Sequence, residues 1–201
     1  MKSIPGLILT LFCAFDLGLA QSPLLDSLIL AQSPVYESLE DALREPEKVY
    51  RLSLKKQKLS AFPMDILKLT NLQELDLSKN QIKELPEEIG QLTNLQILKV
   101  ANNDLELLPG SIGQLKNLRI LVLNRNQLTA LPVQIGDLEN LCYLDLWSND
   151  ITFWPDQLAN LKKLKTMDCR NIMLNLEQQK HIQSLLPNTK IHFDPDCKCG
   201  Q

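Results

Sequence analysis

The chain has little of what catalysis and nucleic-acid binding usually require. Histidine occurs only at His181 and His192, and neither belongs to a recognisable nucleophile–base arrangement. No glycine-rich loop of the kind that cradles phosphate groups is present. Acidic residues slightly outnumber basic ones, and the net charge of −3 argues against general binding to nucleic acid. These absences favour recognition over chemistry, with no cofactor.

Cysteine is also scarce. Beyond Cys13 the chain has four, namely Cys142, Cys169, Cys197 and Cys199, too few for a disulfide framework. The hydrophobic core must therefore stabilise the fold, and we expect Cys169, which takes the place of a core leucine, to be buried. The tail from His192 to Cys199 leaves three readings open: a strained Cys197–Cys199 disulfide, pairing with another chain, or, less favoured, a metal site. We predict no metal.

A long membrane-spanning hydrophobic run is missing too. The apolar stretch from Ile4 to Phe15 follows the basic Lys2 and is too short and interrupted to cross a bilayer. Because small residues follow at Gly18 and Ala20, residues 1–20 are predicted to be a signal peptide for export. Cleavage after Ala31 is an alternative, since Leu-Ala-Gln-Ser-Pro occurs twice, and an uncleaved N-terminal helix of an intracellular protein is another.

What the chain does have is a period of 23 residues, without insertions or deletions. The members of each series stand 23 apart: Asn80, Asn103, Asn126 and Asn149; Pro63, Pro86, Pro109, Pro132 and Pro155; Leu72, Leu95, Leu118, Leu141 and Leu164. A fixed period of this length indicates a solenoid, in which each unit buries its apolar faces only against its neighbours.

One unit, residues 72–94, shows how the sequence builds the repeat. Leu75 and Leu77 alternate with polar residues, which predicts a strand with one buried face. Asn80 can satisfy backbone groups where the chain turns, and each repeat should stack an identical Asn on the last. Pro86 then predicts the start of a short helical or 3₁₀ segment, and Gly90 allows close approach to the next repeat.

The unit L-x-x-L-x-L-x-x-N-x-I/L-x-x-L-P-x-x-I-G-x-L-x-N resembles the leucine-rich repeat family, in the form found in exported bacterial proteins and in eukaryotic intracellular scaffolds. The resemblance implies an α/β solenoid, a right-handed horseshoe with a parallel sheet on its concave face, short 3₁₀ or helical segments on its convex face, and helical caps. We expect a linker at 21–35, an N-terminal cap at 36–48, six repeats at 49–175, and a C-terminal cap and tail at 176–201.

The expected caps have their own signals. Val35, Leu39 and Leu43 share one face of a predicted amphipathic helix from Tyr36 to Glu45, which Pro46 would end. After the repeats, Asn175 followed by Gln178 resembles a capping box, which predicts a helix to Leu186. A last short strand is predicted from Lys190 to Phe193.

The outward positions of the predicted sheet carry more basic than acidic side chains. The basic ones are Arg51, Lys55, Lys56, Lys79, Lys99, Arg119, Arg125, Lys165 and Arg170, and the acidic ones are Glu74, Asp76, Asp145 and Asp168. On a chain that is acidic overall, this asymmetry either steers an acidic partner or reflects ordinary solubility charge.

An apolar column is the sharper signal on the same face. Ile97, Ile120 and Tyr143 occupy one position in successive repeats, with Val122 and Trp147 nearby, whereas Trp154 replaces a core leucine and is expected to pack inside. Aromatic and aliphatic side chains rimmed by charge have the composition of a binding hot spot, although β-branched residues also simply suit strands. The predicted partner-binding residues are Ile97, Lys99, Ile120, Val122, Arg125, Tyr143, Asp145, Trp147 and Arg170.

Six strands about 4.8 Å apart span only about 29 Å, which suits a peptide, a loop or a modest protein. A larger complex would also use flanking loops, where Leu107 and Phe153 are candidates. We therefore predict an exported module that binds a protein partner, by family analogy a host or surface protein, without catalysis, without binding nucleic acid and without a membrane span. The alternatives are an intracellular scaffold and a surface protein that is structural or binds acidic glycans.

Overall fold

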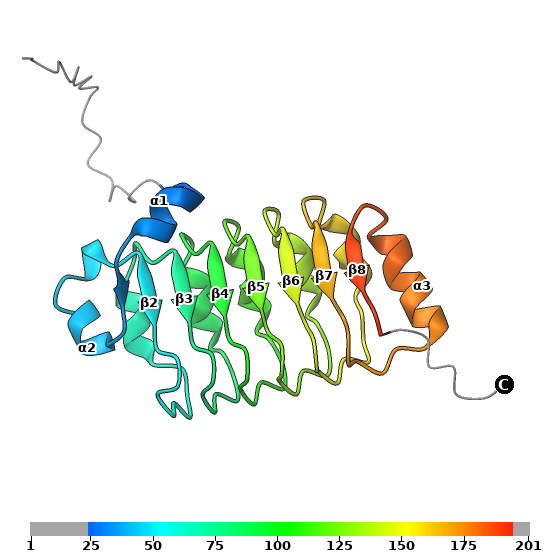
Figure 1. The fold of residues 1–201 in the computed structure, drawn as a ribbon, viewed down its shortest axis with the longest axis horizontal. Helices are drawn as coiled ribbons and strands as arrows, with labels where there is room; N and C mark the ends of the chain where they lie inside the picture. The colour runs from blue at the N-terminus through cyan, green and yellow to red at the C-terminus, as the bar shows by residue number, and fades with distance from the viewer. Residues whose placement is uncertain (1–23, 195–201) are drawn as a thin grey trace, which may run out of the picture.

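The computed structural model describes residues 24–194 and contains, within that range, one open sheet of parallel strands arranged in chain order (Figure 1). The strands are β1 (Val35–Tyr36), β2 (Arg51–Ser53), β3 (Glu74–Asp76), β4 (Ile97–Lys99), β5 (Ile120–Val122), β6 (Tyr143–Asp145), β7 (Thr166–Asp168) and β8 (Lys190–His192). From β2 to β7 each residue pairs with the one 23 positions later. The 23-residue period is thus the register of the sheet.

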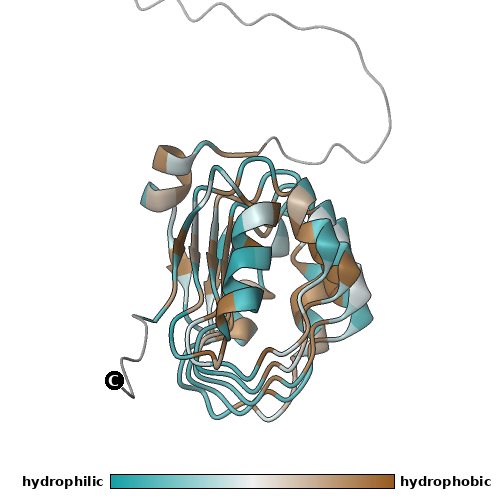
Figure 2. Ribbon diagram, turned by 90° about the vertical axis from the view of Figure 1, so that its right-hand side faces the viewer, coloured by the Kyte–Doolittle hydropathy of each residue, from teal (hydrophilic) through white to brown (hydrophobic). Residues whose placement is uncertain are grey.

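Short 3₁₀ segments return the chain along the opposite side of the solenoid (Figure 2). They are η2 (Met64–Lys68), η3 (Glu87–Gln91), η4 (Gly110–Gln114), η5 (Val133–Asp137) and η6 (Asp156–Asn160), and each begins directly after one of the periodic prolines. Each proline is the N-cap residue, with an extended backbone, and its carbonyl oxygen accepts the first hydrogen bond of the segment, as Pro86 does from Ile89 N–H at 3.0 Å. The predicted layers are confirmed.

The core lies between these two layers and is continuous along the solenoid. Each repeat contributes leucines from its strand and an isoleucine or leucine from its 3₁₀ segment, and most of these side chains are wholly buried. Trp154 and Cys169 belong to this core, at 7% and 1% exposure, as predicted from the leucines they replace. One unit could not bury both faces alone, so the repeats stabilise one another.

The periodic asparagines form the predicted ladder. Asn126 donates from Nδ2 to the carbonyl oxygens of Val100 and Leu123, at 2.9 and 2.8 Å, and accepts a hydrogen bond from Leu105 N–H at 3.1 Å. The Leu123 carbonyl oxygen also accepts from Asn149, one repeat further along, at 3.0 Å. Neighbouring asparagines therefore share carbonyl oxygens, which links each turn to the next.

Gly90 is one of several glycines at which two neighbouring repeats approach closely. A Cβ atom built on it would lie 2.9 Å from the carbonyl oxygen of Ser111 in the next 3₁₀ segment. Any side chain there would have to displace backbone, so glycine at this position sets the spacing of the convex layer.

The C-terminal cap agrees with the prediction. Helix α3 (Leu176–Leu185) begins with a capping box: Asn175 accepts from Gln178 N–H at 2.9 Å, and Gln178 Oε1 accepts from Asn175 N–H at 3.0 Å. Strand β8 then completes the sheet, and α3 covers the end of the solenoid (Figure 1). The repeats are thereby closed by a polar surface at this end.

The N-terminal cap differs from the prediction. Tyr36 lies in β1, helix α2 is only Leu39–Ala42, and Pro46 opens a 3₁₀ segment, η1 (Pro46–Lys48), instead of ending a long helix. β1 pairs with β2, so Val35 continues the sheet and is exposed. The amphipathic pattern of residues 36–45 forms only the short helix α2, because residues 35–36 pair with the open edge of the sheet instead.

The predicted linker at 21–35 also contains structure. Helix α1 (Ser27–Gln32) is capped by Asp26, whose side chain accepts from the N–H groups of Leu28 and Ile29 at 2.8 and 2.9 Å. Leu30 is 2% exposed. Over the described range, the helices are all too short or too polar to cross a membrane. The proposed signal peptide and the tail cysteines lie outside the described residues.

Candidate functional site

The outward surface of β2–β7, here called the sheet face, brings the predicted apolar column together. Ile97, Ile120 and Tyr143 are directly paired on β4, β5 and β6. All three are half-buried, since each is flanked by its neighbours on the adjacent strands. Parallel pairing at one position in successive repeats therefore produces a continuous apolar ridge across the middle of the sheet.

Trp147 lies past the end of β6, beside this ridge. The Arg125 guanidinium lies over its ring, 4.5 Å from the centroid, and the Trp147 backbone N–H donates to Asp145 Oδ1 at 3.1 Å. Such a cation–π contact contributes about 0.5–1 kcal/mol at an exposed site and holds both groups in place. Trp147 is half-buried as a result, and presents an ordered aromatic surface with a charge above it.

One part of the predicted basic surface is neutralised. Glu74, on β3, accepts from Arg51 at 2.6 Å on one side and from Lys99 at 2.7 Å on the other. Burial raises the pKa of the Glu74 carboxyl, but the hydrogen bonds from Lys99 and Arg51 outweigh it and hold that pKa below its ordinary value. Lys99 is therefore engaged in an ion pair with Glu74, and only its remaining exposed surface is available to a binding partner.

A second charge cluster lies at the other end of the sheet face. Arg170 makes a forked contact with Asp168, at 2.6 Å between Nη2 and Oδ2, and its hydrogen bonds keep the pKa of Asp168 low although burial acts to raise it. Asp145 pairs in register with Asp168, and burial raises its pKa. Arg170 therefore lies near Asp145 through Asp168, which pairs with both, and Arg170 is engaged within the chain.

Val122 lies between these clusters, paired with Lys99 on one side and Asp145 on the other. The nine predicted residues consequently share one face: Ile97, Ile120 and Tyr143 form one row across the strands, and the next row places Val122 between the charged Lys99 and Asp145. In the flanking loops, Leu107 and Phe153 are each 57% exposed, so they are accessible as the sequence led us to expect.

Sequence reasoning missed the N-terminal segment, which docks on this face. Gln73 and Gln96 hold Leu25 from two sides: Leu25 N–H donates to Gln73 Oε1 at 2.9 Å, and Gln96 Nε2 donates to the Leu25 carbonyl at 2.8 Å. Arg51 donates to the carbonyl oxygens of Ala31 and Ser33 at 3.0 and 3.1 Å. Asp26, an N-cap residue before the apolar Leu28, was the signal that could have revealed the helix.

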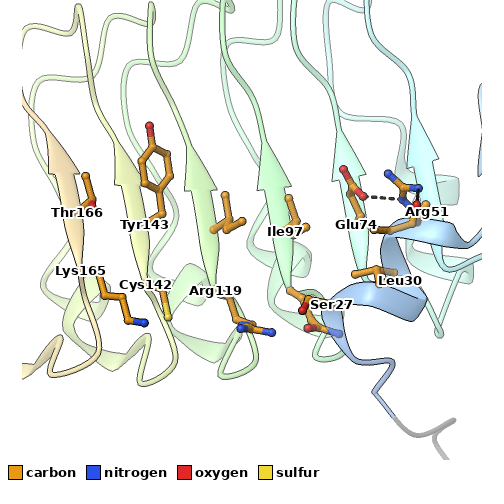
Figure 3. Close-up of a pocket in the computed structure, with 13 residues that line it drawn as sticks. Ser27, Leu30, Arg51, Glu74, Ile97, Arg119, Cys142, Tyr143, Lys165 and Thr166 are labelled. Atoms are coloured by element: carbon orange, nitrogen blue, oxygen red, sulfur yellow. Dashed lines mark hydrogen bonds and ion pairs between the residues drawn. The ribbon is translucent and has the colours of Figure 1, made fainter.

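Docked in this way, α1 closes one end of a groove of about 500 Å³ that crosses the sheet toward β7 (Figure 3). Ile97, Ile120 and Tyr143 form its floor, and Leu30 with Ala31 form its closed end. Arg119, Cys142 and Lys165 line one long edge, each directly before its strand (Figure 3). The groove therefore offers an apolar floor beside a basic edge.

The described residues that were considered for catalysis or metal binding do not lie together in the structure. His181 lies on α3, 3.3 Å from Asp156, and His192 lies on β8, two strands away from β6, which follows the half-buried Cys142. Burial raises the pKa of the Cys169 thiol well above its ordinary value, which makes it a packing group. Within the described residues no three metal-binding side chains gather.

Sequence comparison matches two family patterns to the repeats. The pattern described as "Leucine-rich repeat region" matches residues 48–121, and that described as "Leucine rich repeat" matches residues 116–171. No curated protein matches the chain.

Several solved structures have the same architecture. A leucine-rich repeat protein of Leptospira interrogans is 37% identical, with a TM-score of 0.59 over 75% of this chain and 45% of that one. The ectodomain of the membrane receptor kinase GASSHO1/SCHENGEN3 from Arabidopsis thaliana, in complex with CASPARIAN STRIP INTEGRITY FACTOR 2, is 31% identical, with a TM-score of 0.55 over 63% and 16%. Listeria monocytogenes InlP, 24% identical with a TM-score of 0.59 over 71% and 38%, shares the fold. The chain spans less than half the length of each of these three.

Proposed function

Because the chain belongs to the leucine-rich repeat family, we propose that it is an exported module that binds a protein partner on its sheet face and catalyses no reaction. Repeats of this family commonly mediate protein–protein interaction. The observation that carries the proposal is the ridge of Ile97, Ile120 and Tyr143 beside the ordered pair of Trp147 and Arg125. Aromatic and Arg side chains at the centre of an apolar patch are the usual anchors of a protein interface.

Export rests on residues 1–20, and the docked N-terminal segment bears on where cleavage would occur. Cleavage after Ala31 would remove most of α1, including the buried Leu30 and the hydrogen bonds of Leu25 to Gln73 and Gln96. Cleavage after Ala20 would leave these contacts intact. These contacts support a mature N-terminus at Gln21. N-terminal sequencing of secreted material tests this, and an intact Met1 would instead favour the intracellular scaffold.

The partner interface is tested by Ile120→Asp combined with Trp147→Asp. The double variant places carboxylates in the middle of the ridge and removes the ring below Arg125, so capture of a partner from a surface extract should be lost. Circular dichroism should show an unchanged fold, because both side chains are only half-buried on the outside of the sheet.

The matched control is Met64→Asp combined with Val133→Asp. These exposed residues lie in η2 and η5 on the opposite side of the solenoid, so the control makes the same chemical change away from the sheet face. Capture should survive in the control. If the sheet-face variant folds and captures the same partner as the wild type, the proposed interface is wrong.

A further inference from the structure

The groove closed by α1 combines two features that no repeat has alone. Its floor of Ile97, Ile120 and Tyr143 belongs to the apolar ridge, whereas its closed end is built by the docked segment through Leu30 and Ala31. Figure 3 shows the side chain of Leu30 directed toward the sheet, next to the ion pair of Arg51 and Glu74. A ligand lying across the strands would therefore end, or turn away, at α1.

Some charged side chains around this groove form ion pairs within the chain and others do not. Glu74 is paired with Arg51 and Lys99, so the closed end carries little uncompensated acidity. Arg119 and Lys165, in contrast, are exposed, and no acidic side chain of the described residues forms an ion pair with either. Cys142 lies between them and is small, which leaves space above it (Figure 3). The open edge of the groove thus presents two available cations to a ligand.

We propose that this groove binds an extended acidic peptide segment of the partner, with aliphatic or aromatic side chains on Ile97, Ile120 and Tyr143 and two carboxylates at Arg119 and Lys165. The inference rests on the proposed function and names the chemistry of the partner at that surface. Charge complementarity selects the carboxylates, and the apolar floor selects a peptide over an acidic glycan, which has few apolar groups to place there.

The geometry sets the spacing of the two carboxylates. Arg119 and Lys165 precede β5 and β7, which are two strand steps apart, or about 10 Å. An extended peptide advances about 3.3 Å per residue and its side chains alternate between two sides, so two carboxylates on the same side stand two or four positions apart, at about 7 or 13 Å. The long side chains of Arg119 and Lys165 can reach either spacing. The side chains at the odd positions between them point to the other side of the peptide, where Ile120 and Tyr143 can receive them.

A selection from random octapeptides displayed on phage tests the proposal without assuming a partner. Peptides enriched on the wild-type protein should carry two acidic residues two or four positions apart, with apolar residues at the odd positions between them. A fluorescein-labelled enriched peptide should then bind at least tenfold more weakly to the variant Arg119→Glu with Lys165→Glu, measured by fluorescence anisotropy. Ile120→Asn should also weaken binding.

The matched control is Lys162→Glu with Lys180→Glu, which changes the net charge equally at exposed positions away from the sheet face and should leave affinity unchanged. Bound peptide should also slow alkylation of Cys142, followed by mass spectrometry, because that thiol lies in the groove.

Several outcomes would overturn the proposal. The proposal is wrong if no peptide is enriched or if the enriched peptides lack acidic residues. It is also wrong if the Arg119→Glu, Lys165→Glu variant binds the peptide with unchanged affinity. Binding of polygalacturonate that Ile120→Asn leaves intact would also overturn it and would identify a glycan ligand. A dimer abolished by the Arg119→Glu, Lys165→Glu variant would identify a second copy as the occupant. If alkylation of Cys142 is as slow without peptide as with it, the groove is already occupied and the proposal is wrong.

If partner capture still depends on Ile120 and Trp147 while the peptide selection fails, the proposed function stands and only this inference is wrong.

Discussion

The asparagine ladder allows a test of whether hydrogen bonds that share a carbonyl oxygen contribute to the free energy of unfolding independently of one another. In Asn126→Ala, the buried Leu105 N–H loses its acceptor, whereas the carbonyl oxygens of Val100 and Leu123 each keep one donor, from Asn103 and Asn149 respectively. One unsatisfied N–H destabilises by about 1–3 kcal/mol, and two lost bonds to satisfied carbonyls by about 1 kcal/mol each or less. We expect the free energy of unfolding to fall by about 3 kcal/mol.

The sharing of carbonyls makes neighbouring substitutions non-additive. Combining Asn103→Ala with Asn126→Ala removes both donors to the Val100 carbonyl oxygen, so the pair should destabilise by about 1–3 kcal/mol more than the sum of the single variants. Asn80 donates to Leu54 and Leu77 and shares no carbonyl with Asn126. Asn80→Ala with Asn126→Ala should therefore be additive within about 0.5 kcal/mol.

Urea unfolding followed by circular dichroism measures each variant. Gln57→Ala serves as the control, because Gln57 stands at the asparagine position of the first repeat and is exposed, with one side-chain hydrogen bond to Glu37. It should lower stability by less than about 1 kcal/mol. Equal coupling in the neighbouring and the separated pairs would refute the reasoning, since the shared carbonyls would then have no energetic consequence.

Three further predictions follow from other contacts. Glu74→Gln should lower stability by about 2 kcal/mol at neutral pH; because the pKa of Glu74 is lowered from 4.5 on folding, the difference from wild type should shrink as the pH falls below that value in pH-dependent unfolding. Lys79→Asn should raise stability by about 0.5 kcal/mol in urea unfolding, since residue 79 has a φ of 61° that asparagine tolerates better than lysine; a loss would contradict this. Gly113→Ala should destabilise by about 2 kcal/mol in thermal unfolding, because its Cβ would lie 2.7 Å from the Gln134 carbonyl oxygen, whereas Gly110→Ala, with nothing nearer than 3.4 Å, should be almost neutral; equal effects would contradict the argument.

Most of the scaffold could be predicted because its interactions repeat. Asn126 meets the same backbone groups as Asn103 and Asn149, and each periodic proline opens a 3₁₀ segment, so one correct reading of a unit applies to all. The capping box of Asn175 and Gln178 was also readable, since both partners are three residues apart in the sequence. Local spacing was sufficient in each case.

The candidate site was only partly predictable. The alignment of Ile97, Ile120 and Tyr143 on one row followed from the period, but the pairing of Lys99 with Glu74 depended on which long side chains reach one another across strands. The docking of the segment that leads into α1 could not be predicted, because Leu25 is held by Gln73 and Gln96, 48 and 71 positions away along the chain.

By itself, then, the sequence determined the solenoid, its register and the apolar ridge, because a 23-residue period places equivalent side chains on neighbouring strands wherever the chain repeats. Only the tertiary structure decided that α1 docks beside the first strands of the sheet and that Arg119 and Lys165 form no ion pair beside the groove it closes. The physical reason is that α1 does not repeat: its place depends on hydrogen bonds and burial between segments distant in sequence, which no periodicity encodes.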